Sequence, residues 1–115
     1  MPNSSTGTLA EKQALSYLQE QGLFLVCQNY YCRFGEIDLI MLDQDTLVFI
    51  EVRYRKNNDF GGGFASINNR KQRKIITTAK HYLTTLDNEP FCRFDAVAID
   101  SRSTTPDWIK DAFQE

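Results

Sequence analysis

The chain has 115 residues, of which 42% are hydrophobic, 12% aromatic and 24% charged. This length and composition suit one compact domain with an ordinary apolar core, and they exclude a disordered chain, a collagen and a coiled coil. Lys and Arg number 13 and Asp and Glu number 15, which gives a formal net charge of −2. The total charge therefore does not indicate a nucleic-acid or anionic-membrane partner.

The amino-terminal part of the chain predicts a polar tail followed by a helix. Residues 1–7 lack the basic and apolar segments of a targeting signal, so we expect a disordered tail there and a single domain over 8–115. Apolar residues at helical spacing predict a helix from Leu9 to Gln21, ended by Gly22. The odd number of cysteines and the absence of a run of about 18 apolar residues predict a cytoplasmic protein with no membrane partner.

The rest of the chain predicts strands around one further helix. Short apolar segments bounded by turn residues predict four strands and a short fifth, over 23–29, 35–42, 46–55, 91–99 and 108–110. Three consecutive glycines indicate a loop at 56–66, and an apolar stripe predicts a helix from a cap at Asn68 or Asn69 to Leu86. The order α-β-β-β-α-β-(β) predicts an α/β fold with a mixed central sheet flanked by helices.

Two acidic side chains are predicted to meet between the second and third strands. A hairpin turn at 44–45 would place Asp38 opposite Glu51, and Glu36 opposite Arg53. Facing like charges are destabilising, so a shared proton or a divalent cation such as magnesium should compensate them. The alternative is a solvated strand end at which Glu36 or Glu51 pairs with Arg53.

Glu11 has two interpretations, and the spacing leaves both open. Thr8-x-x-Glu11 has the form of a capping box, in which the glutamate would satisfy a backbone donor at the helix start. Glu11 also lies on the apolar face of its helix, where it would be a third acid directed at Asp38 and Glu51.

Basic residues are concentrated in the middle of the chain. Four of them crowd the first turns of the second predicted helix, where the helix dipole is already positive: Arg70, Lys71, Arg73 and Lys74. A docked phosphate would compensate these charges, so the four residues, together with Arg55, are the predicted nucleic-acid-binding residues. The alternative is a solvated basic face.

Several motifs resemble a known family. Gly35-Glu36-Ile37-Asp38-Leu39-Ile40 followed by Phe49-Ile50-Glu51-Val52-Arg53 resembles the YraN-like family of small bacterial proteins. Gly7-x-x-x-Glu11, Arg93-Phe94-Asp95 and Asp111-Ala112-Phe113 extend the resemblance over about residues 7–113. That family is similar to the restriction-endonuclease-like superfamily and to archaeal Holliday junction resolvases. The resemblance implies an α-β-β-β-α-β core with a magnesium-dependent PD-(D/E)xK site.

Transferred residue by residue, the resemblance makes Asp38 and Glu51 the metal ligands and Glu11 the acid of the first helix. Arg53 stands where the motif has lysine, and Ile37 stands where it has proline. An arginine stays protonated and can steady a phosphate, but it cannot accept a proton as a lysine can.

These observations predict a nuclease-like protein that depends on Mg²⁺ or Mn²⁺ and acts on the phosphodiester bonds of branched or structured DNA. Its catalytic residues would be Asp38, Glu51, Arg53 and Glu11. The alternative is a non-catalytic nucleic-acid-binding module whose PD-(D/E)xK site is degenerate at Arg53. The related resolvases imply a homodimer.

Overall fold

The computed structural model describes residues 5–55, 67–100 and 105–115, and every structural statement below refers to these residues. They form two helices and five strands: α1 (Ser5–Glu20), β1 (Phe24–Cys32), β2 (Gly35–Asp43), β3 (Thr46–Arg55), α2 (Asn69–Leu83), β4 (Phe91–Asp100) and β5 (Asp107–Phe113). The predicted element order is confirmed, including the fifth strand. The loop predicted at 56–66 lies outside the described residues.

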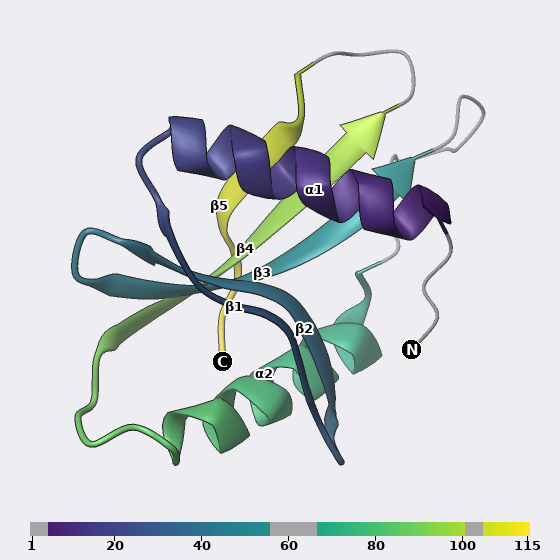
Figure 1. The fold of residues 1–115 in the computed structure, drawn as a ribbon. Helices are drawn as coiled ribbons and strands as arrows, with labels where there is room; N and C mark the ends of the chain where they lie inside the picture. The colour runs from purple at the N-terminus through teal and green to yellow at the C-terminus, as the bar shows by residue number, and fades with distance from the viewer. Residues whose placement is uncertain (1–4, 56–66, 101–104) are drawn as a thin grey trace.

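The five strands form one mixed sheet in the order β1-β2-β3-β4-β5. β1, β2 and β3 are an antiparallel meander, β3 and β4 are parallel, and β5 returns antiparallel to β4. Helix α2 lies between the parallel strands in the chain, as a crossover connection requires. Helices α1 and α2 lie on opposite faces of the sheet (Figure 1). No helix in the described part of the chain is long and apolar enough to cross a bilayer.

Each helix covers its own apolar cluster. On the α1 face, Ala10, Ala14 and Leu18 pack with strand residues that include Leu39, Met41, Val48, Ile50 and Val97. On the α2 face, Ile75 and Ala79 pack with strand residues that include Ile37, Ile40, Phe49 and Phe94. Because both faces of the sheet are covered, β3 is buried continuously over 47–52.

Several element boundaries differ from the predictions. Helix α1 begins at Ser5, so residues 5–7 of the expected disordered tail are helical, and Thr8 lies within the helix. Apolar periodicity begins only at Leu9 and therefore missed the turn before it. Helix α2 ends at Leu83, before the predicted Leu86, and β5 continues to Phe113. Local patterns predicted a shorter β5. The end of the strand is held by stacking of the Phe113 ring on the Phe94 ring of β4, a contact between distant residues.

The β2–β3 hairpin has the register that the turn at 44–45 predicts. Its pairs run from Leu39↔Ile50 to Asp43↔Thr46. Gln44 adopts a positive φ of 59°, as the tight reversal of the chain demands. This register brings Asp38 of β2 and Glu51 of β3 to the same end of the hairpin.

Candidate functional site: an acid pair beside a basic helix

Asp38 lies where the β2–β3 ladder ends. The pairing of the two strands stops at Leu39, and the Asp38 carboxylate accepts a hydrogen bond of 2.8 Å from the backbone N–H of Val52. Ile37 and Ile40 both pack on the α2 face, so the regular alternation of faces breaks at Asp38. Asp38 and Glu51 were predicted to be a directly paired couple in the ladder. In the structure they meet through their side chains, just beyond the last pair of the ladder.

Burial raises the pKa of both members of this acid pair. Burial and then the charge of Glu51 raise the pKa of Asp38 to about 8, although the Val52 hydrogen bond opposes the shift. Burial also raises the pKa of Glu51, while Arg53 and Lys71 lower it in part. Glu51 is only 5% exposed. The pair therefore holds a proton at higher pH than isolated carboxyl groups would.

Two cations contact Glu51. The Arg53 guanidinium lies 2.9 Å and the Lys71 ammonium 3.7 Å from the same carboxylate oxygen, Oε2. Arg53 also has a buried Nε without a hydrogen-bond partner among the described residues. Glu36 does not face Arg53 as predicted. It pairs with Tyr31 of β1, because β2 leaves β3 beyond Leu39 and stays with its other neighbour.

Glu11 points from α1 toward the sheet. Its Oε1 accepts a hydrogen bond of 3.0 Å from the side-chain amide of Asn29 in β1, and its charge contributes to the raised pKa of Asp38. The capping-box interpretation is wrong because α1 already begins at Ser5, so Glu11 is not at the helix start. Of the two interpretations, the one that directs Glu11 at the acid pair agrees with its position.

The donor set offers little more than two carboxylates to a metal ion. Within residues 5–55, 67–100 and 105–115, no group of three or more His, Cys, Asp or Glu side chains is placed to hold one. Magnesium commonly takes only one or two carboxylates from a protein and fills its other positions with water and phosphate. Asp38 and Glu51 meet this minimal requirement by number and by donor chemistry.

The predicted basic residues separate into three groups. Lys71 belongs to the acid pair, as described above. Arg70, Arg73 and Lys74 line a shallow depression of about 280 Å³ together with Phe34 and Thr77.

Arg55 lies apart from these residues. It is ion-paired with Asp100 of β4 and Asp107 of β5, so it links the three strands at one end of the sheet. The parallel register of β3 and β4 places Arg55 beside Asp100, a pairing that local sequence does not reveal.

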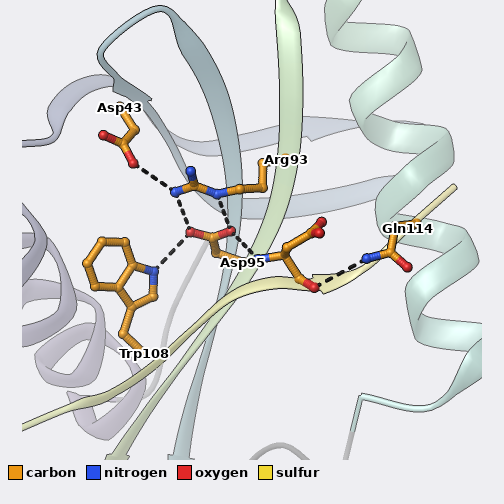
Figure 2. A network of polar contacts seen from close by, with 6 residues as sticks. Asp43, Arg93, Asp95, Trp108 and Gln114 are labelled. Atoms are coloured by element: carbon orange, nitrogen blue, oxygen red, sulfur yellow. Dashed lines mark hydrogen bonds and ion pairs between the residues drawn. The ribbon is translucent and has the colours of Figure 1, made fainter.

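A second buried acid, Asp95 of β4, was not predicted as a separate centre. Its carboxylate is fully buried and accepts hydrogen bonds from Arg93 Nε and a terminal nitrogen of Arg93, from Trp108 Nε1 and from the backbone N–H of Asp111, all at 2.9–3.0 Å (Figure 2). Arg93 also reaches Asp43 at the end of β2. The i, i+2 spacing of Arg93 and Asp95 on one strand face was the available signal.

The fold and the site thus define a small α/β protein with an acid pair next to a basic helix. Residues 10–99 match the family described as Uncharacterised protein family UPF0102, and the chain belongs to that family. It is similar to a UPF0102 protein of Psychromonas ingrahamii, 83% identical over 113 residues that cover 98% of this chain and 93% of the relative.

More distant relatives match over almost the same length. A UPF0102 protein of Pseudomonas fluorescens is 50% identical, with 98% of each chain covered. One from Legionella pneumophila is 53% identical, with 93% of this chain and 92% of the relative covered.

Proposed function

We propose that this protein binds nucleic acid, DNA in the first instance, and cleaves its phosphodiester bonds with the help of a divalent cation. The observation on which the proposal rests is the pair formed by half-buried Asp38 and buried Glu51, which Arg53 and Lys71 contact through Glu51. Buried like charges are costly and concentrate at functional sites. This pair adjoins cations suited to a phosphate, and its two carboxyl groups supply the oxygen ligands that a divalent cation prefers.

Asp38 and Glu51 would hold Mg²⁺ or Mn²⁺, since both cations prefer carboxylate oxygen. When bound, the cation polarises a phosphate oxygen and makes a bound water more acidic. The protein's own groups have complementary tasks. Arg53 and Lys71 steady the negative charge of the phosphate, and the unpartnered Nε of Arg53 provides one further donor near it. Glu11 adds negative charge from α1.

The restriction-endonuclease-like arrangement and the likeness to junction resolvases belong to this proposal. Support comes from the α-β-β-β-α-β order and from acids on β2 and β3, the elements where the PD-(D/E)xK pattern expects them. The resemblance implies branched or structured DNA as the substrate and a homodimer as the acting form.

The first experiment measures metal binding and cleavage in Asp38→Asn. Calorimetric titration of Mn²⁺ into the wild-type protein is expected to show binding that the variant loses, because asparagine supplies no charge. Cleavage of labelled four-way junction, flap, single-stranded and duplex DNA should fall by about 100-fold or more in the variant, as for the loss of a group that acts in the transition state.

Asp45→Asn is the matched control, since Asp45 is an exposed acid at the far end of the same hairpin. It should bind metal and cleave as the wild-type protein does. The proposal fails if neither protein binds Mn²⁺, or if Asp38→Asn cleaves as well as the wild type does.

Arg53 supports a second candidate, a nucleic-acid-binding module without turnover. Arg53 is paired with Glu51, and an arginine side chain can bind a phosphate but does not serve as a proton acceptor. This candidate predicts salt-sensitive DNA binding without cleavage in the wild-type protein and metal-dependent cleavage in Arg53→Lys. Cleavage by the wild type that Arg53→Lys leaves unchanged would reject it.

A further inference from the structure

The turn between β1 and β2 lies against helix α2. Gly35 has a φ of 151°, and a Cβ at this position would lie 3.1 Å from the hydroxyl oxygen of Thr78. A side chain at this position would therefore press on Thr78 and would be strained by the positive φ. In Figure 1 this end of the hairpin passes across α2. The contact fixes the residue before the glycine, Phe34, beside the helix.

The Phe34 ring is positioned but not buried. It is 37% exposed, the Arg33 guanidinium lies over it at 4.8 Å from the ring centroid, and the His81 ring meets it at 5.9 Å between centroids. His81 is held in turn by the Tyr30 hydroxyl, 2.6 Å from its Nδ1. An aromatic ring held in this way on the surface gains little from the apolar core, so its placement calls for another explanation.

Phe34 forms one wall of the 280 Å³ depression, and a stripe of α2 forms the other. The stripe contains Arg70, Arg73, Lys74 and Thr77, which share one helix face because they are spaced at i, i+3, i+4 and i+7. None of the three cations has an ion pair with any described residue. No acidic residue of the described ranges lines the depression, so its charge suits an anion.

We propose that this depression binds an unpaired nucleotide, whose base stacks on the Phe34–Arg33 platform and whose phosphates lie along Arg70, Arg73 and Lys74. The proposal rests on the proposed function in taking the ligand to be nucleic acid, and it deepens that function by naming the substrate class. Bases inside a duplex expose only their edges, whereas an unpaired base offers a face for stacking on aromatic rings and guanidinium planes.

The depression and the acid pair meet in the first turn of α2. Arg70 lines the depression, and the next residue, Lys71, contacts Glu51. The site then selects the single-stranded part of a substrate, such as an overhang, a flap or an open branch point, and presents the adjoining phosphodiester bond to Asp38 and Glu51.

The experiment measures affinity by fluorescence anisotropy, with EDTA present so that no metal ion takes part. Labelled deoxyoligonucleotides are supplied as single strand, blunt duplex and duplex with a short single-stranded overhang. The wild-type protein should bind the single strand and the overhang more tightly than the blunt duplex. Phe34→Ala should weaken binding of those two probes by roughly 5- to 100-fold and leave the blunt duplex within about twofold.

Phe34→Trp keeps a flat ring and should retain the preference. Phe91→Ala removes a more exposed aromatic ring, 76% exposed at the start of β4, and should change nothing. The proposal is overturned if Phe34→Ala weakens all three probes equally, if Phe34→Trp loses as much affinity as Phe34→Ala, or if the wild type prefers the blunt duplex. Because Phe34 is tested without metal and Asp38 with it, failure of this proposal leaves the metal-dependent function standing, and the reverse also holds.

Discussion

Asp38 and Asp95 are both carboxylates within the sheet, but their surroundings supply very different numbers of donors. Asp95 accepts four hydrogen bonds, two of them from the Arg93 guanidinium. Asp38 accepts one from the Val52 N–H and has the Glu51 carboxylate as its neighbour. The first group is compensated by the protein itself, and the second calls for a proton or an external cation.

This difference predicts how stability depends on pH. The pKa of Asp38 is about 8 in the folded protein, against an ordinary value of about 3.9 in the unfolded chain. Between these two values the folded state holds a proton that the unfolded state has lost, so the free energy of unfolding falls as pH rises. The raised pKa of Glu51 acts in the same direction.

The measurement is the melting temperature of the protein from pH 5 to pH 8.5 in EDTA. The decline toward high pH should be clearly smaller in Asp38→Asn, whose amide keeps an acceptor for Val52 and titrates no proton. Asp45→Asn is expected to follow the wild-type curve. Parallel curves for the wild type and Asp38→Asn would show that Asp38 is not protonated in the folded state.

At the scale of elements, β5 is held to the sheet largely by polar contacts. Most of its residues are exposed, and Trp108 and the backbone of Asp111 both donate to Asp95 (Figure 2). Trp108 also packs edge-on against Tyr17 of α1, with the ring centroids 6.3 Å apart. Asp95 therefore links β4, β5 and, through Trp108, the first helix.

Replacement of Asp95 by asparagine is expected to destabilise the fold by about 3 kcal/mol in urea denaturation. This is the low end of the cost of breaking a buried ion pair, because Arg93 keeps Asp43 as a partner. Trp108→Phe loses one donor and should cost about 1 kcal/mol. Hydrogen exchange should increase first in β5. A loss below about 0.5 kcal/mol for Asp95→Asn, the range of the exposed control Asp87→Asn, would contradict this account.

Local patterns predicted those parts of the fold that depend on neighbours in the chain. The hairpin register followed from the two-residue turn, and the element order followed from periodicity. Contacts between distant segments were not predictable, such as Arg55 with Asp100 and Asp107, because the parallel pairing of β3 with β4 brings them together. The break in face alternation at Asp38 was not predictable either, because it depends on where β2 stops pairing with β3.

At the scale of the whole molecule, the net charge of −2 hides a separation of charge. Arg55, Arg93 and Lys80 are neutralised by acidic partners, whereas the stripe of Arg70, Arg73 and Lys74 has none among the described residues. The surface that a phosphate backbone would meet is therefore more basic than the composition indicates.

This separation predicts a salt dependence. The logarithm of the DNA-binding constant should fall with the logarithm of salt concentration, with a slope of about −0.7 to −0.9 per phosphate contact. Replacing Arg70, Arg73 and Lys74 together with glutamine should reduce the slope by about 2 to 3. Lys80→Gln changes a cation of the same helix that pairs with Glu115 and should leave the slope unaltered. Equal slopes for the triple variant and the wild type would exclude the stripe from the interface.

The different surroundings of Asp38 and Asp95 also have a consequence for selection in the laboratory. Asp38→Asn should make the protein more heat-resistant at neutral pH, whereas Asp95→Asn should make it less so. Variants selected only for thermal stability would therefore retain Asp95 and replace Asp38, and they would lose the proposed activity as their stability rises. Variants that tolerate heat best would be the poorest material in which to look for a nuclease.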